Sequence, residues 1–329
     1  MDLAKIDKNF ATQTVSKQDV KWRSALSDDF SVHGITYSSE LGHFVRMPQK
    51  IADQVNEGVS KHETIILQYG FSIYVDDVYY GMIAPTFNQI SHDGKDVEYD
   101  AEIEFTLFGV IPNNYHNITI FTPLYGSVKQ LFIGLKEDSQ VKPQSPYTHT
   151  KPVVFYGSSI TQGGVASRAG NDYVGLISQE LDTEILNLGF SGSARGEQVI
   201  AEYISGLDAS VFVIDYDHNA KTVEHLRNTH LPFYKTIRNK QPTTPIVMIS
   251  RPNYGRLPKT DNERKRVIIE TYEHALNNGD KNVYFIDGET FFQGQFRNAC
   301  TVDGTHPSDL GFYLMAKKIA PVIKKLLDK

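Results

Sequence analysis

The feature that most constrains the fold is a series of five short apolar segments after residue 151, with helical patterns between and after them. The segments cover residues 153–156, 184–188, 211–215, 246–250 and 283–286. The clearest helical patterns cover residues 263–277 and 310–327. Strands that alternate with helices in this way form a parallel sheet with helices on both faces. Residues 151–329 are therefore predicted to form a three-layer α/β/α domain.

The first part of the chain has a different pattern. Residues 97–105 alternate apolar and polar side chains, as a strand with one solvated face does, and residues 118–121 and 128–135 are also strand-like. A helix is predicted only at residues 48–58. Residues 136–151 are polar, contain Pro143 and Pro146, and are predicted to be a linker. We therefore expect residues 1–140 to form a small, mostly antiparallel β-sandwich domain.

Composition limits the functional class. The net charge is −6 and the charged residues are interspersed, so a nucleic-acid partner is not expected. No apolar stretch approaches the roughly 18 residues of a membrane-spanning helix, and residues 1–7 lack the apolar core of a signal peptide. A single cysteine, Cys300, cannot form an internal disulfide. These observations predict a cytoplasmic protein without a membrane partner, and homo-oligomerisation is left open.

Polar residues follow four of the five predicted strands. Ser159 follows the first, Gly192 the second and Asn219 the third, whereas Asp303 and His306 follow the fifth, just before the last helix. The carboxyl ends of parallel strands meet at one edge of a sheet, and ligands bind there. These residues are therefore expected to converge on one site.

The residue types at this edge suit acyl transfer. A serine hydroxyl needs a nearby base, a histidine can be that base, and an acid on its other ring nitrogen fixes the tautomer. Asp303 and His306 are close enough in sequence for one loop to carry both. An oxyanion also needs preorganised donors, and the backbone N–H groups of Ser159 and Gly192 with the Asn219 amide would supply three. Such a site needs no metal or organic cofactor.

These segments resemble the SGNH (GDSL-type) hydrolases. Gly157-Ser158-Ser159-Ile160-Thr161 is similar to the family's Gly-Asp-Ser-Ile/Leu signature, and 188–192 to its glycine segment. Residues 217–219 stand where the family has Gly-x-Asn, and 303–306 match its Asp-x-x-His. The resemblance implies a flavodoxin-like sheet, Ser159 as nucleophile, His306 as base, Asp303 as the orienting acid, and Gly192 and Asn219 as oxyanion donors. It also implies ester substrates, often acetylated sugars.

The N-terminal part resembles more faintly the β-sandwich of a subgroup of these esterases. That subgroup has a Gly-x-Asp-Leu-Tyr motif, and residues 70–74, Gly-Phe-Ser-Ile-Tyr, are a degenerate version of it. The favoured interpretation is a serine esterase that acts on short acyl esters, acetyl esters first among them, of a small molecule or oligosaccharide. The alternatives are an acyltransferase with the same acyl-serine and a non-catalytic carbohydrate-binding protein on a hydrolase scaffold.

Several residues have competing interpretations. Ser158 replaces the family's aspartate and leaves open which serine attacks, and Asp217 replaces its glycine. Ser159 and Asn219 are also residue types that cap helices. A metal site at His218, His225 and His230 is disfavoured against surface or supporting roles. Cys300 is expected to be a small buried hydrophobic residue, and Arg168 either lines the substrate pocket or forms a structural ion pair.

Overall fold

The computed structural model describes residues 20–55, 63–85, 114–252, 258–294 and 296–329. Its largest sheet has five parallel strands in the order β12-β11-β10-β8-β9. The strands are β8 (His149–Gly157), β9 (Thr183–Gly189), β10 (Val211–Asp215), β11 (Ile246–Ile249) and β12 (Val283–Ile286). Taken in chain order this arrangement is 2-1-3-4-5, the flavodoxin-like order, so the predicted fold class is confirmed.

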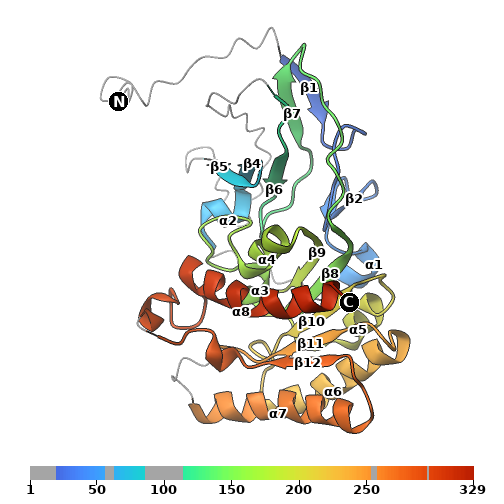
Figure 1. Cartoon of the computed structure of the whole chain (residues 1–329), viewed down its shortest axis with the longest axis vertical. Coiled ribbons are helices and arrows are strands. Elements are labelled where there is room, and N and C mark those ends of the chain that lie inside the picture. The colour runs from blue at the N-terminus through green and yellow to red at the C-terminus, as the bar shows by residue number, and fades with distance from the viewer. Residues whose placement is uncertain (1–19, 56–62, 86–113, 253–257, 295) are drawn as a thin grey trace.

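Helices cover both faces of this sheet (Figure 1). The helices of this part are α3 (Ser159–Gln162), α4 (Tyr173–Leu181), α5 (Gln198–Ile204), α6 (Val223–Lys240), α7 (Pro258–Asn277) and α8 (Asp309–Leu327), with 3-10 turns at Gly288–Thr290 and Arg297–Ala299. Neighbouring residues of one strand face opposite cores, because side chains alternate along a strand. Val153 and Phe155 pack in the core beneath α4 and α8, whereas Val154 and Tyr156 pack in the core beneath α5, α6 and α7.

The N-terminal region, defined here as residues 20–136, forms three small antiparallel sheets within its described residues, 20–55, 63–85 and 114–136. β1 (Val20–Ser24) pairs with β7 (Phe132–Lys136), β2 (Thr36–Ser38) with β3 (His43–Val45), and β4 (Phe71–Val75) with both β5 (Val78–Ile83) and β6 (Ile118–Phe121). The same described ranges also contain two short helices, α1 (Gln49–Ala52) and α2 (Ile65–Tyr69). Antiparallel strands were predicted here and are present, and their closure into a sandwich stays a prediction.

The structure corrects several boundaries in this region. The helix predicted over residues 48–58 is only α1 within the described residues, and the strand predicted over 128–135 begins at Phe132. The predicted linker ends earlier than residue 151, because β8 begins at His149. The strand predicted over 97–105 lies outside the described residues. Ser72, the serine of the degenerate motif, lies on β4 and is fully buried, with no described residue bonded to its hydroxyl.

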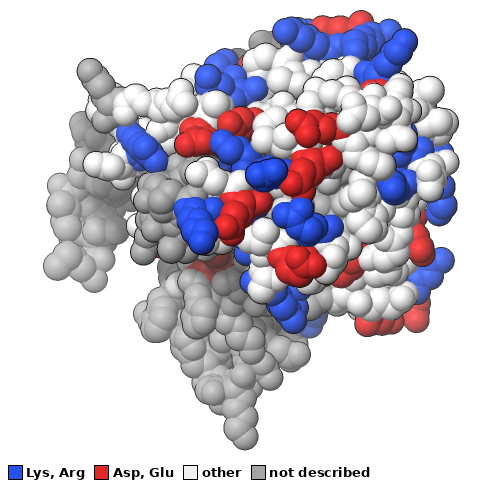
Figure 2. Space-filling model, turned by 90° about the horizontal axis from the view of Figure 1, so that it is seen from below, with Lys and Arg blue, Asp and Glu red and all other residues white. Residues whose placement is uncertain are grey.

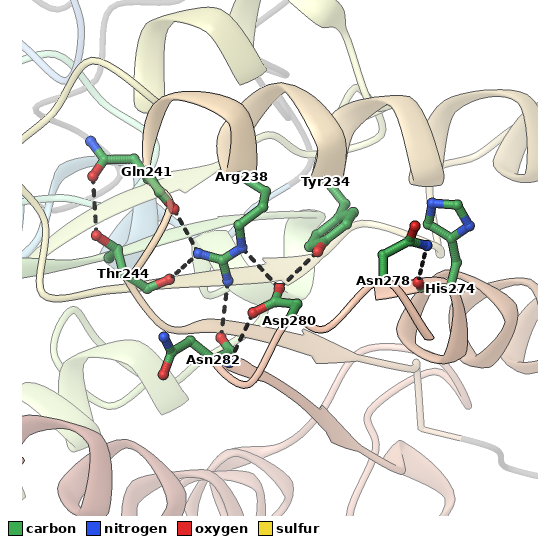
Figure 3. Close-up of polar contacts among 8 residues, drawn as sticks. All are labelled: Tyr234, Arg238, Gln241, Thr244, His274, Asn278, Asp280 and Asn282. Carbon is green, nitrogen blue, oxygen red and sulfur yellow. Dashed lines mark hydrogen bonds and ion pairs between the residues drawn. The ribbon is translucent and has the colours of Figure 1, made fainter. Parts of the chain in front are cut away.

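A largely buried ion pair holds the edge of the sheet where β11 and β12 begin (Figure 3). The predicted site lies at the opposite edge, where the strands end. Arg238 of α6 donates to the Asp280 carboxylate at 2.8 Å and to the carbonyls of Gln241, Thr244 and Asn282. Tyr234 donates to the same carboxylate at 2.7 Å. This network joins the end of α6 to the segments that enter β11 and β12, so it stabilises the scaffold rather than the site.

The surface is mixed in charge on the face seen from below, where basic and acidic side chains are interspersed (Figure 2). Ion pairs on α7 and its neighbours have the same character: Arg266 contacts Glu270 and Lys265 contacts Asp287. Among the described residues, no helix has both the length and the apolar character needed to cross a bilayer.

Candidate active site

A tight turn between β8 and α3 presents Ser159. A Cβ at Gly157 would come within 2.5 Å of the Asp215 carbonyl oxygen and closer still to Thr161, so only glycine fits there. Ser158 is the N-cap of α3: its buried hydroxyl accepts from the Ile160 N–H at 3.2 Å. The capping role that sequence allowed for Ser159 is therefore filled by Ser158. The Ser159 hydroxyl points to a different partner.

That partner is His306. The Ser159 Oγ lies 2.8 Å from the His306 Nε2, and the His306 Nδ1 lies 2.7 Å from the Asp303 Oδ2. A carboxylate can only accept, so Nδ1 carries the ring proton and Nε2 is left to accept the serine proton. Ser159 thus forms one hydrogen-bonded chain with His306, which is 147 residues away in the sequence, and with Asp303 of the same loop as His306.

The loop that carries Asp303 and His306 is held by its own backbone. The Asp303 Oδ1 accepts from the N–H groups of Thr305 at 2.8 Å and His306 at 2.7 Å. The Val302 N–H donates to the His306 carbonyl at 2.9 Å. Partial burial alone would raise the pKa of Asp303, but the hydrogen bonds from the His306 ring and from the two N–H groups outweigh it and lower the pKa to about 2. Asp303 is therefore ionised throughout the neutral range.

The predicted oxyanion donors lie at the same edge as Ser159. Gly192 follows β9 and Asn219 follows β10, the two strands that flank β8. Gly192 has φ +69°, which favours glycine, and its Cβ position is open. No described residue accepts from the N–H groups of Ser159 or Gly192 or bonds to the Asn219 amide. Neither Gly192 nor Asn219 bonds to Ser159 or His306, so the oxyanion role stays a prediction, supported by their place at this edge and by the unbonded Gly192 N–H and Asn219 side-chain amide.

The two residues before Asn219 lie beside the site: Asp217 is buried, and His218 is partly buried with its Nε2 inside. Burial raises the pKa of Asp217 to about 6, although the Arg251 and Arg264 side chains and the Arg251 N–H oppose the rise. Burial, and next the positive charge of Arg251, hold the pKa of His218 well below its ordinary value. His218 is therefore neutral at pH 7, and its Nε2 has no bonded partner among the described residues.

A buried carboxylate, that of Asp215, supports the turn that carries Ser159; the sequence had shown this residue only as the end of a strand. Asp215 ends β10 and accepts from the Thr161 hydroxyl of α3 at 3.0 Å and from the Tyr173 hydroxyl of α4 at 2.9 Å. Burial, followed by the nearby charge of Asp217, raises the pKa of Asp215 to about 7. No sequence motif predicts this contact, because it depends on how α3 and α4 pack on the sheet.

The remaining candidates are structural. His230 is buried rather than at the surface: it bonds to Thr271 at 2.9 Å, and burial lowers its pKa to about 3. Within the part of the chain that the structure describes, no cluster of His, Cys, Asp and Glu could hold a metal ion. Cys300 is a free, buried thiol. Arg168 lies over the Tyr79 ring at 3.9 Å, so it joins the N-terminal region to the loop after α3.

Comparison with known families defines the class of protein. A model of the GDSL-like Lipase/Acylhydrolase family matches residues 150–324. This match covers more than half of the 329 residues, so the chain belongs to that family. The family and its solved relatives support an ester hydrolase.

The similarity to solved structures extends over the N-terminal region as well. A GDSL-like lipase from Bacteroides ovatus ATCC 8483 is 26% identical, with a TM-score of 0.77, over 94% of this chain and 98% of that one. The salicylyl-acyltransferase SsfX3 from a tetracycline biosynthetic pathway is 16% identical (TM-score 0.66; 92% and 95% coverage). A family two carbohydrate esterase from Clostridium thermocellum, solved with cellohexaose, is 17% identical (TM-score 0.57; 79% and 86% coverage). No curated protein matches the sequence.

Proposed function

We propose that this chain is a serine esterase that hydrolyses short acyl esters, acetyl esters first among them, through an acyl-serine intermediate. The observation that carries the proposal is the chain of hydrogen bonds from Ser159 through His306 to Asp303, with distances of 2.8 and 2.7 Å. Both distances are within normal hydrogen-bond range, and the base is already in reach of the nucleophile.

In the first half-reaction the Ser159 Oγ attacks the ester carbonyl carbon while its proton passes to the His306 Nε2. The carbonyl oxygen becomes an oxyanion, for which the N–H groups of Ser159 and Gly192 and the Asn219 amide are the proposed donors. His306 then gives its proton to the alcohol oxygen as the carbon–oxygen bond breaks. In the second half-reaction water, deprotonated by His306, attacks the acyl-serine and releases the acid and free Ser159.

An acetylated carbohydrate is the proposed substrate class. Its support is the resemblance of the sequence segments to esterases that act on acetylated sugars, and the shared fold with a carbohydrate esterase. We also propose that residues 1–140 form a carbohydrate-binding-like β-sandwich domain beside a catalytic domain of residues 151–329. With the cytoplasmic location proposed from composition, the substrate would be an imported oligosaccharide or a metabolite.

A chromogenic acetyl ester assay tests the proposal. Wild type is expected to turn over the ester, and Ser159→Ala is expected to lose the activity. Ser158→Ala is the matched control, because it removes the neighbouring hydroxyl and only a helix cap, which costs about 1 kcal/mol of stability. Equal rates for wild type and Ser159→Ala would remove the esterase proposal and favour the non-catalytic binding protein.

An acyltransferase remains the second candidate, because the same acyl-serine can be captured by an alcohol in place of water. The acyltransferase with the same fold gives this candidate its support. Product partition decides between the two: the esterase predicts free acid as the main product when sugar or alcohol acceptors are added at millimolar concentration. Acyl transfer to the acceptor as the main product would favour the transferase.

A further inference from the structure

The side-chain amide of Gln162 connects three segments that are distant in sequence. Gln162 is the last residue of α3 and is 4% exposed. Its Nε2 donates to the Leu124 carbonyl of the N-terminal region at 3.2 Å, and its Oε1 accepts from the Ser191 N–H at 2.8 Å. One amide therefore holds together the nucleophile helix, the N-terminal region and the residue that precedes Gly192.

The N-terminal region makes a second contact with the same residue. The Tyr125 hydroxyl donates to the Ser191 hydroxyl at 3.4 Å. Burial raises the pKa of Tyr125, so the hydroxyl keeps its proton and remains a donor. The N–H groups of Leu124 and Tyr125 both donate to the carbonyl of Leu67, a fully buried residue of α2. The contact with Ser191 thus comes from a fixed loop.

Arg46 holds the start of the same segment. It donates to the Gly189 carbonyl at 2.6 Å, and its guanidinium lies 5.1 Å from the centre of the Phe190 ring. Gly189 also packs so closely against α3 that a Cβ there would come within 2.1 Å of the backbone nitrogen of Gln162. Residues 189–191 are therefore held from both sides, by α3 and by the N-terminal region.

We propose that Gln162 and Tyr125 are positioning residues that aim the Gly192 N–H at the developing oxyanion. The Ser191 N–H, which is engaged by Gln162, fixes the Phe190–Ser191 peptide, the peptide next to the one that carries the Gly192 N–H, and the Gly192 N–H has no partner among the described residues. An oxyanion donor acts only when it is held in place before the reaction, and a displacement of about 1 Å can cost a hundredfold in rate. The N-terminal region is then part of the catalytic apparatus. This inference rests on the proposed esterase function.

Steady-state kinetics on the full chain with p-nitrophenyl acetate test the inference. Gln162→Met removes both amide contacts at nearly constant volume, and Tyr125→Phe removes one hydroxyl. Tyr74→Phe is the matched control: the Tyr74 hydroxyl accepts from Arg168 at 3.4 Å, which is also a contact between the N-terminal region and the loop after α3, but one that does not reach Ser191. Thermal melts of all variants show whether each is folded.

We expect kcat and kcat/KM to fall together, by about tenfold for Gln162→Met and about threefold for Tyr125→Phe, because an interaction made only in the transition state is weakened. The affinity of a boronic acid, which forms a tetrahedral adduct with the nucleophile, should fall by the same factors. Tyr74→Phe should keep wild-type kcat. Tyr125→Phe is the milder substitution and carries the test if Gln162→Met does not fold.

The inference would be overturned if folded Gln162→Met and Tyr125→Phe kept the wild-type kcat and only their melting temperatures fell. An equal loss of kcat in Tyr74→Phe would overturn it as well. Either result leaves the esterase proposal standing, provided that turnover still requires Ser159. A wild-type protein without Ser159-dependent turnover would instead overturn both.

Discussion

Replacing Asp303 with asparagine tests how the acid orients the base. The two carboxylate oxygens have different tasks: Oδ2 accepts from the His306 ring, and Oδ1 accepts from the N–H groups of Thr305 and His306 at 2.8 and 2.7 Å. Asparagine has one acceptor oxygen only. If that oxygen stays with the two N–H groups, the NH₂ group faces Nδ1, and the ring must carry its proton on Nε2, where it cannot accept the serine proton.

The opposite amide orientation restores the tautomer but directs the NH₂ group at the two backbone donors. Both N–H donors are exposed, so water can replace the lost acceptor in part. At about 0.5–1.5 kcal/mol for each lost hydrogen bond, the productive orientation lies about 1–3 kcal/mol above the other. At 1.4 kcal/mol for each tenfold change, that difference alone reduces kcat by about fivefold to about 100-fold. The loss of the negative charge behind the imidazolium adds to it.

The assay is hydrolysis of a chromogenic acetyl ester at pH 7.5 by wild type, Asp303→Asn and Asp303→Ala. Alanine leaves Nδ1 open to water and imposes no tautomer, so Asp303→Ala should retain at least as much kcat as Asp303→Asn. An Asp303→Asn variant within about threefold of wild-type kcat would refute the assigned role of the acid. A crystal structure of the variant would show whether the asparagine side chain still faces the His306 ring.

Three further predictions concern different parts of the molecule. Asn219→Ala should lower kcat by roughly a hundredfold with little change in KM, in the same ester assay, because one of three proposed oxyanion donors is lost. Asp215 has a pKa of about 7 in the folded protein against an ordinary value of 3.8, so the folded protein keeps a proton there that the unfolded chain loses. Stability should therefore fall as pH rises from about 4 to 7. Melting temperatures at pH 5 and pH 8 should differ more for wild type than for Asp215→Asn. Arg238→Met leaves the buried Asp280 carboxylate unpaired and should cost about 3–5 kcal/mol by denaturant unfolding, with kcat unchanged (Figure 3). Unchanged kcat in Asn219→Ala, a pH dependence identical in both proteins, or wild-type stability of Arg238→Met would contradict the respective argument.

The parallel sheet was predictable because its strands are buried on both faces. Such strands appear as continuous apolar runs, and the predicted bounds of β10 and β12 agree with the structure to the residue. β1 was missed because only part of it is buried and its partner β7 lies more than a hundred residues away. Short strands of this kind depend on tertiary pairing, which local pattern does not contain.

The sequence predicts those candidate site residues that come directly after a strand of the parallel sheet. Ser159, Asp303 and His306 have the residue types that acyl transfer requires, and a parallel sheet brings such positions to one edge. Gln162 and Tyr125 could not be predicted in the same way. They act through contacts between the N-terminal region and the loop after β9, and no spacing in the sequence encodes that packing.

Labelling with a fluorophosphonate probe tests the central claim most directly, because the probe reacts with an activated serine and forms a stable adduct that peptide mass spectrometry can place. The account predicts one adduct on wild type, on Ser159, and its loss in His306→Ala, where the base is missing. An adduct on Ser158 or on another serine, or equal labelling of wild type and His306→Ala, would contradict it.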